Sequence, residues 1–173
     1  MMRLLRIYLS LLILFIYAGA DALSQASATG HIVAEIIPVF TATETSQLNF
    51  GRFAPGPEGG KIILAPQGNI MVMGSVYKGT GLHNAASFYV TGDQDASFSI
   101  TLPESPVILK HTTSEKTMTV EDWVSVPTPG IGTGALHNGQ QTVHVGATLN
   151  VGTLNDNPPG IYTGTYEISF DFN

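Results

Sequence analysis

The last fourteen residues, Gly160–Asn173, constrain the fold more than any other part of the sequence. Large apolar side chains recur at every second position there, with one glycine in the same register; the set is Tyr162, Gly164, Tyr166, Ile168, Phe170 and Phe172. Polar side chains occupy most of the intervening positions. A period of two predicts a half-buried β-strand. Because chain ends usually fray, we expect these side chains to be buried by a sheet or by another protein.

The opening residues have the pattern of a secretory signal peptide. Two arginines, Arg3 and Arg6, precede an apolar run from Ile7 to Tyr17, and small residues follow it. The run is short for a membrane span, which takes about 20 residues, so contact with the membrane is expected only during export. We assign residues 1–22 to the signal peptide. Cleavage after Ala20, Ala22 or Ala26 fits the pattern, and the choice among them stays open.

The remaining residues, 23–173, suit one domain with a sizeable core. The formal net charge of −6 argues against nucleic acid as a partner. The chain has no cysteine, so disulfides and thiolate metal sites contribute nothing to its stability. Nineteen glycines, ten prolines and few charged residues predict short strands joined by turns.

Apolar alternation along residues 23–173 predicts about nine strands. Residues 31–40 form a first strand, interrupted by Pro38, and residues 142–151 alternate most clearly, with Val143, Val145, Ala147, Leu149 and Val151 inward. Residues 88–91 and 97–102 are predicted to pair as a hairpin around Gly92–Asp95. Residues 55–60 and 127–140 are predicted to be loops. The pattern predicts an all-β fold, an antiparallel immunoglobulin-like β-sandwich in a single domain.

Residues for catalysis or metal binding do not form a recognisable motif. The five histidines include no HxH or HxxxH pair, so we predict no metal site. The chain has no cysteine nucleophile and no GxSxG elbow, and no serine has a histidine or an acid at a diagnostic spacing. We therefore predict no catalytic residues, no cofactor and no enzyme activity. A triad assembled in space stays open at this point.

Trp123, the only tryptophan, follows Glu121 and Asp122. An aromatic face beside carboxylates is one way to bind a sugar, which makes Trp123 the candidate ligand-binding residue. The competing interpretation is a core tryptophan whose acidic neighbours are exposed.

Three pieces of the sequence resemble a family of secreted bacterial domains. They are Leu48–Gly51, then Ala86–Gly92, and finally Val145–Gly152 (VGATLNVG) followed by Gly160–Tyr166 with its GxYTGT motif. Together they are similar to the family called domain of unknown function 4402, over essentially the whole of residues 23–173. The resemblance implies a secreted β-sandwich and no particular activity.

The carboxyl end also resembles, more loosely, subunits of chaperone–usher pili in Gram-negative bacteria. Gly160 is fourteenth from the end, the alternation follows it, and Phe172 is penultimate. The disulfide common in that family is missing, and Leu23–Gly30 is a poor detachable donor strand. The resemblance implies a sandwich that lacks one strand, whose groove is filled by a periplasmic chaperone and then by the amino-terminal strand of a neighbouring subunit.

These observations predict an exported, non-catalytic structural or adhesive surface protein of the fimbrial-subunit type. Its expected partners are proteins, either like subunits or a periplasmic chaperone, and it would lie in the periplasm, at the cell surface or outside the cell. The partner-binding residues are expected to be Gly160, Tyr162, Gly164, Tyr166, Ile168, Phe170 and Phe172. A self-contained carbohydrate-binding sandwich and a secreted hydrolase are the alternatives. Residues 32–40 could complete the edge beside the terminal strand, or a partner could.

Overall fold

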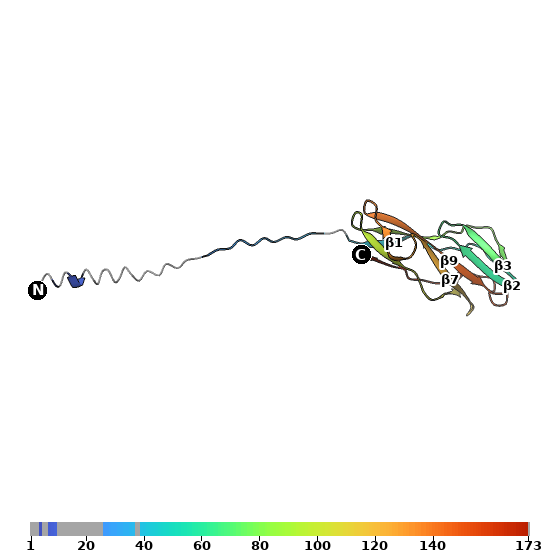
Figure 1. Ribbon diagram of the computed structural model, residues 1–173. Coiled ribbons are helices and arrows are strands. Elements are labelled where there is room, and N and C mark those ends of the chain that lie inside the picture. Colours follow the sequence, from blue (N-terminus) through green and yellow to red (C-terminus); the bar gives the residue numbers. More distant parts are fainter. Residues whose placement is uncertain (1–3, 5–6, 10–25, 37–38, 173) are drawn as a thin grey trace. The chain divides into compact units, whose positions relative to one another are not determined.

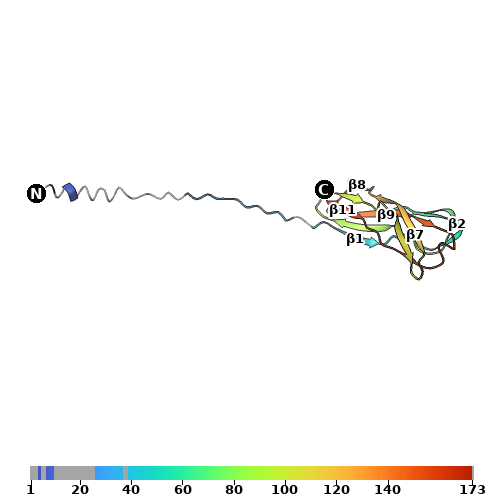
Figure 2. The same cartoon turned by 90° about the horizontal axis from the view of Figure 1, so that it is seen from below.

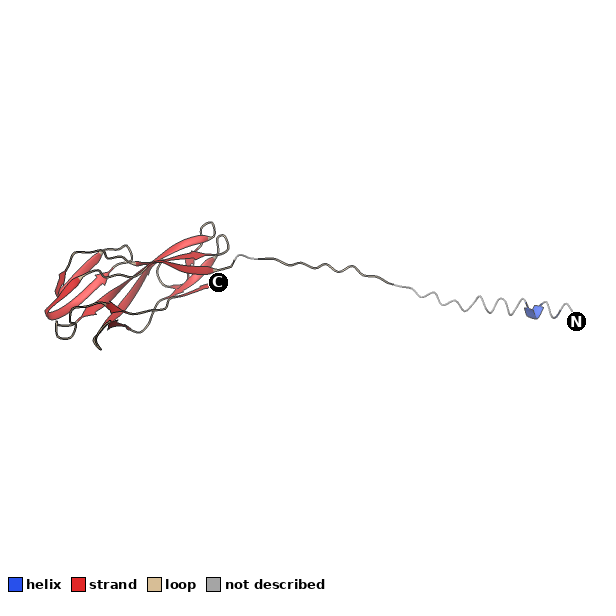
Figure 3. Ribbon diagram, turned by 180° about the vertical axis from the view of Figure 1, so that it is seen from behind, coloured by secondary structure: helices blue, strands red, loops and turns tan. Residues whose placement is uncertain are grey.

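The computed structural model describes residues 4, 7–9, 26–36 and 39–172. The chain divides into two units, residues 1–35 and 36–173. Among these described residues, helix is found at Leu4 and residues 7–9 of the first unit, and the described part of the second unit consists of strands and loops (Figure 3). Within the described ranges, no helix has the length and apolar character needed to cross a membrane. Most of the predicted signal peptide lies outside the described residues, so it stays a prediction.

Eleven strands are formed by the described residues of the second unit. In chain order they are β1 (Thr41–Ser46), β2 (Phe53–Leu64), β3 (Ile70–Lys78), β4 (Ala86–Thr91), β5 (Ser97–Thr101), β6 (Val107–His111), β7 (Thr117–Val126), β8 (Gly130–Ala135), β9 (Gln140–Val151), β10 (Tyr162–Thr163) and β11 (Ser169–Phe172).

The strands form two sheets in which every pair is antiparallel. The larger sheet has the order β1-β4-β9-β7-β6-β10, with the β2–β3 hairpin joined to it through β9, and the smaller has the order β11-β5-β8. Strand β9 organises the larger sheet because its first half pairs with β4, its second half with β2, and most of its length with β7. The smaller sheet lies near β1, away from the end that carries β2 and β3 (Figures 1 and 2). The predicted all-β antiparallel sandwich is confirmed.

The core consists of two apolar clusters that share the inward face of β9. One contains Ile62, Val120 and Leu149, and the other contains Phe98, Val143 and Val145. The predicted inward residues of β9 are all buried. This strand of twelve residues thus contributes to both clusters.

In strand β7 the inward-facing residues change from even-numbered to odd-numbered positions part-way along the strand. Met118 and Val120 point into the core, and then the register with β9 shifts between Glu121 and Val124. Asp122 has a positive φ of 52°, a left-handed conformation that accommodates the extra residue of a β-bulge. Beyond it the inward positions are Trp123 and Ser125, so Trp123 packs against both clusters.

The predicted hairpin of residues 88–91 and 97–102 is wrong in its pairing. Strand β4 pairs with β1 and β9 in the larger sheet, whereas β5 pairs with β8 and β11 in the smaller. Val90 and Phe98 are both fully buried in one cluster. Alternation therefore identified the inward face of each strand correctly, but strands of opposite sheets share such a pattern as readily as hydrogen-bonded neighbours do.

Three boundaries also differ from the prediction. Residues 55–60 belong to β2, with a register shift between Pro55 and Gly59, and β8 lies within the predicted loop of residues 127–140. Both segments are rich in glycine. Because glycine has no side chain, apolar alternation does not reveal these strands. Residues 31–36 and 39–40 are in no strand, and residues 37–38 of that predicted strand are outside the described residues.

The terminal segment is two short strands rather than one. Strand β10 pairs with β6 at the edge of the larger sheet, and β11 pairs with β5 at the edge of the smaller. Gly164–Ile168 connects them and belongs to neither sheet. The predicted alternation persists across this break, since Tyr162, Tyr166, Ile168 and Phe170 are half-buried and the residues between them are exposed. Both sheets require part of this segment, so it crosses from one to the other.

Candidate functional site

A groove of about 900 Å³ lies beside the terminal segment. Two stretches of chain contribute most of its lining, namely residues 47–53 before and at the start of β2, and residues 157–166 around β10. Buried or half-buried residues of the first core cluster complete it, among them Leu109, Met118, Val120 and Leu149. The apolar core therefore contributes directly to the surface of the groove, which we call the core groove.

The backbone of Gly164–Ile168 borders the core groove without a β-partner. Within the described part of the chain, no hydrogen bond joins this stretch to another backbone group. The neighbouring residues are paired, because Tyr162 and Thr163 lie opposite His111 and Lys110. A row of free amide and carbonyl groups next to a groove lined by buried and half-buried core residues is the arrangement that accepts an added strand.

The amino-terminal side of the core groove is fixed by two asparagines. Asn49 accepts a hydrogen bond from the Gly51 N–H at 2.8 Å, and its backbone is bridged to that of Asn84. The Asn84 side-chain amide donates to the Ser46 hydroxyl and to the carbonyl oxygen of Gln47. These bonds hold residues 46–51 in a defined turn at the entrance to β2.

The opposite side is fixed by Asn157 and His111. The buried Asn157 accepts a hydrogen bond from the Gly152 N–H at 2.6 Å and donates to the Thr117 carbonyl oxygen at 2.8 Å. His111 Nε2 lies 3.2 Å from the Pro159 carbonyl oxygen, and its Nδ1 accepts from the Thr113 N–H at 3.1 Å. The His111 ring also packs edge-on against Tyr162.

Gly160 and Gly164 allow close approach to the domain's own strand β6. A Cβ on Gly160 would lie 2.0 Å from His111 Nε2, and one on Gly164 would lie 2.7 Å from the Ile108 carbonyl oxygen. The missing side chains of these two glycines therefore let the terminal segment pack closely against β6.

Two rings meet where the core groove joins the second core cluster. Trp123 and Tyr166 have ring centroids 4.7 Å apart at an interplanar angle of 34°. Among the described residues, Trp123 Nε1 and the Tyr166 hydroxyl are the buried side-chain polar atoms with no hydrogen-bond partner. Burial raises the pKa of Tyr166 to about 12, and the nearby Glu44 carboxylate adds to the rise. Both groups retain an unused capacity to donate a hydrogen bond.

The predicted partner-binding residues divide into two groups. Gly160, Tyr162, Gly164, Tyr166 and Ile168 line the core groove. Phe170 instead packs between Phe88 and Phe98 in the second cluster, and Phe172 contacts Phe40. The sequence pattern did not identify residues 47–53 as part of the site. Leu48, Phe50 and Phe53 of this stretch pack against the first core cluster and line the groove, but they do not belong to a sustained alternating run.

The acids beside Trp123 do not accompany it into the core groove. A hydrogen bond from Asn150 lowers the pKa of Glu121, and a smaller effect comes from Lys61. Lys61 Nζ donates to Glu121 at 3.2 Å in an exposed pair. Asp122 is exposed at the bulge. One face of the indole is covered by Tyr166, so the site offers a different geometry from the aromatic-plus-carboxylate edge considered for sugars.

A serine and a histidine that are far apart in sequence meet across β4 and β9. Ser87 Oγ lies 2.9 Å from His144 Nδ1, in a hollow also lined by His83 and Asn84. Within the described ranges, no carboxylate hydrogen-bonds to His144, and no group of three or more histidine or acidic residues could hold a metal ion. A nucleophile and a base without an orienting third group form an incomplete catalytic arrangement.

The family sequence model for the domain of unknown function DUF4402 matches residues 40–172 of this chain. The chain belongs to the DUF4402 family. The match begins at Phe40, the residue before β1, so it covers both sheets and all lining of the core groove. No curated protein matches the chain at a significant level.

Proposed function

We propose that this DUF4402 domain is an exported, non-catalytic structural or adhesive surface protein of the fimbrial-subunit type, which binds a protein partner by accepting an extended segment in the core groove. The observation that carries the proposal is the unpaired stretch Gly164–Ile168, which borders a groove lined by core residues. An added strand would satisfy the free backbone groups and cover the exposed apolar surface together.

The two sides of the core groove support binding by strand addition. The hydrogen bonds of Asn49, Asn84, Asn157 and His111 fix the chain on both sides of the groove. A groove with a fixed shape costs less conformational entropy to fill than one that must be ordered during binding. Export agrees with the signal-peptide pattern, and the proposed location is the periplasm or the cell surface.

Hydrogen–deuterium exchange tests this function directly. The amides of Gly164–Ile168 should exchange rapidly in the dilute, isolated chain and slowly in assemblies recovered from the periplasm of a Gram-negative host. The exposed loop at Leu154 and Asn155 serves as the internal control and should exchange rapidly in both samples. Equal, rapid exchange of Gly164–Ile168 in both samples would contradict strand addition.

Carbohydrate binding is the second candidate function, favoured by one observation. Trp123 and Tyr166 line a groove that also contains other aromatic and amide side chains. Aromatic rings can stack on sugars, and amide groups can bond to sugar hydroxyl groups. Glycan-array binding that is lost in Trp123→Ala and retained in Val124→Ala would support this function, and the absence of any glycan signal would exclude it for the glycans tested.

A further inference from the structure

The outer face of the larger sheet carries no charged side chain where β1, β4 and β9 run side by side. Glu44 is the one residue of these three strands with a formal charge at pH 7, and it lies opposite Phe88 on the inner side, where both line the core groove. The residues that alternate with the buried Val90 and Val143 therefore point outward. They form two rows across the strands, first Thr41, Thr91 and Gln140, then Thr43, Tyr89 and Thr142. We call these six residues the neutral face.

The polar groups of the neutral face keep much of their hydrogen-bonding capacity. The Tyr89 hydroxyl donates to the amide oxygen of Gln140, which leaves the Gln140 amide nitrogen available. Thr43 and Thr142 lie on either side of Tyr89, are exposed, and make no side-chain hydrogen bond to another described residue. Tyr89 is itself 39% exposed. An aromatic ring between hydroxyl groups that each donate and accept is therefore open to a ligand.

A hollow of about 450 Å³ adjoins the neutral face, and we call it the side hollow. Ser87 and His144 form the next row of the outward face and line it, together with residues 66–68 of the turn between β2 and β3. Ser87 Oγ lies 2.9 Å from His144 Nδ1, and no described residue is hydrogen-bonded to the other ring nitrogen, Nε2. The side chains of Gln67 and His83, also in the lining, make no hydrogen bond to described residues either. The side hollow thus supplies further uncommitted donors and acceptors.

We infer that the neutral face and the side hollow together bind a neutral oligosaccharide. Sugar hydroxyl groups both donate and accept hydrogen bonds, and the hydroxyl, amide and imidazole groups of this surface can match them in either role. The exposed ring of Tyr89 provides an apolar platform for the C–H face of one sugar ring. The side hollow has a volume within the range of about 300–1,000 Å³ that small-molecule sites occupy. It receives the terminal sugar, and the neutral face carries the sugars that follow.

Charge selects a neutral ligand over an ionic one. A phosphate, sulfate or carboxylate group would meet no lysine or arginine in β1, β4 or β9, and the chain has a formal net charge of −6. A cationic ligand would meet no carboxylate of these strands on this side, because Glu44 lines the core groove. Removing an ionic group from water without a counter-charge is unfavourable, whereas sugar hydroxyl groups exchange one set of hydrogen bonds for another.

The composition of the neutral face favours a sugar over a protein partner. A stable protein interface has a desolvated apolar centre, and Tyr89 is the one large apolar side chain among the six residues. The other five are threonines and a glutamine, which offer hydrogen bonds and little apolar area.

The sugar site is separate from the core groove. Phe88 lines the core groove, and its neighbours Ser87 and Tyr89 point to the opposite side of β4. The inference therefore goes beyond the proposed function and does not rest on it. A chain that carries both sites binds a glycan on one side of the larger sheet and a protein strand on the other.

An array of neutral oligosaccharides, with sulfated and uronic-acid oligosaccharides beside them, tests the class of ligand on the full exported chain. At least one neutral oligosaccharide should bind, and its affinity should change less than about twofold between low and high salt, because no ion pair is involved. Binding confined to the charged oligosaccharides, or no binding to any neutral one, would overturn the inference.

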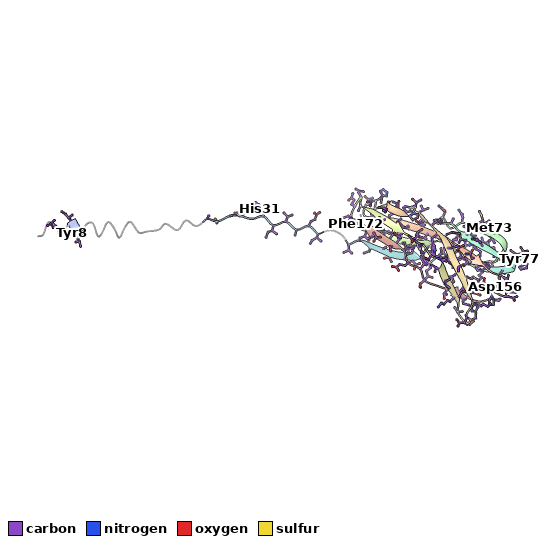
Figure 4. All side chains as sticks on the ribbon, turned by 60° about the horizontal axis from the view of Figure 1, so that its bottom comes forward. Tyr8, His31, Met73, Tyr77, Asp156 and Phe172 are labelled. Carbon is purple, nitrogen blue, oxygen red and sulfur yellow. The ribbon has the colours of Figure 1, made fainter. Side chains whose placement is uncertain are left out.

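Two exposed tyrosines on strand surfaces provide a matched comparison. Tyr89→Ala removes the aromatic platform and should weaken binding of the neutral oligosaccharide about tenfold. Tyr77 lies near Met73, at the end of the domain that carries β2 and β3 (Figure 4), and Tyr77→Ala should leave the affinity unchanged. Equal losses in the two variants would overturn the assignment of the site.

Thr142→Asp tests the neutral face without removing a large side chain. The added carboxylate lies beside Tyr89 and should weaken binding about tenfold, while Thr101→Asp, at the exposed end of β5 in the smaller sheet, should leave it unchanged. Far-UV circular dichroism at the temperature of the binding measurement establishes that both variants are folded. Affinity retained in folded Thr142→Asp contradicts the inference.

One further variant separates this site from the second candidate function. Trp123 lines the core groove, so Trp123→Ala, measured under conditions where it is folded, should bind the neutral oligosaccharide as the parent chain does. If binding is lost in Trp123→Ala and retained in Tyr89→Ala and Thr142→Asp, the sugar lies in the core groove; the second candidate function then stands and the inference falls.

Discussion

Trp123 and Tyr166 stack with ring centroids 4.7 Å apart, and the polar atom of each ring is buried without a hydrogen-bond partner. Trp123 comes from the bulge in β7, and Tyr166 comes from the unpaired stretch between β10 and β11. The pair therefore joins the two core clusters to the edge of the core groove. It leaves two buried hydrogen-bond donors unsatisfied beside the core groove.

Trp123→Ala should be among the most destabilising single substitutions in the domain. The indole packs against both core clusters, so its removal leaves a cavity between them and should lower the free energy of unfolding by about 3–5 kcal/mol. The neighbouring Val124 is exposed, and Val124→Ala should cost less than about 1 kcal/mol. Urea denaturation followed by far-UV circular dichroism measures both, and a small loss for Trp123→Ala would show that the clusters are independent.

The Tyr166 phenol should make the domain less stable at alkaline pH. Its pKa is raised from the ordinary tyrosine value of 10.0 to about 12, first by burial and then by Glu44. Between these values the unfolded chain loses the proton while the folded chain keeps it, so stability falls as pH rises from about 10 to 12. Tyr166→Phe should flatten this part of a plot of stability against pH. Tyr77→Phe, at an exposed position, should leave the slope unchanged, and equal slopes for Tyr166→Phe and the parent would refute the assignment.

Asn157 tests how firmly the carboxyl-terminal side of the core groove is held. Its amide oxygen accepts from Gly152 and its amide nitrogen donates to Thr117, so Asn157→Ala should cost about 1–3 kcal/mol. Asn157→Asp keeps the first bond but points an acceptor at the Thr117 carbonyl oxygen, and it should cost at least as much near neutral pH. Chemical denaturation gives both values. A fully stable Asn157→Asp variant would mean that the bond to Thr117 contributes nothing.

The sequence predicted which residues of each strand face inward better than it predicted which strands pair. The inward residues of β9 and the half-buried alternation from Tyr162 to Phe170 follow from a period of two, which depends only on which side of the backbone is buried. That period gives no information about which strands pair. The predicted pairing of β4 with β5 was therefore wrong, and the division of the terminal segment between two sheets was not predicted. The inward turn of Trp123 depends on a bulge with Asp122 at positive φ, for which the sequence carries no clear signal.

Only part of the candidate site was predicted, because the local sequence reveals alternating side chains but not long-range contacts. The terminal residues were identified because their side chains alternate, and five of the seven line the core groove. Residues 47–53 contribute Leu48, Phe50 and Phe53 to the groove, and their position there is fixed by the long-range contact of Asn49 with Asn84. A contact between residues so far apart in sequence cannot be inferred from a local pattern.

Gly160→Ala should destabilise the junction between β6 and β10. The added methyl group would lie 2.0 Å from His111 Nε2, and the ring is held by its contacts with Pro159 and Thr113. Displacing it should cost about 1–3 kcal/mol. In the double variant Gly160→Ala with His111→Ala the methyl group has room, so the two costs should be less than additive in a double-mutant cycle. Simple additivity would show that the His111 ring is not what restricts residue 160.

Phe170 and Phe172 have the same chemistry and alternate along one strand, so they separate core packing from contacts at the edge. Phe170 packs against Phe88 and Phe98, and Phe170→Ala should cost about 3–5 kcal/mol. Phe172 is 47% exposed and meets Phe40, the first residue of the family match, so Phe172→Ala should cost no more than about 2 kcal/mol. Because neither residue lines the core groove, the protection of Gly164–Ile168 expected in assemblies should be unchanged in Phe172→Ala. A loss of assembly in this variant, with its stability retained, would place part of the binding surface beside Phe40 and outside the core groove.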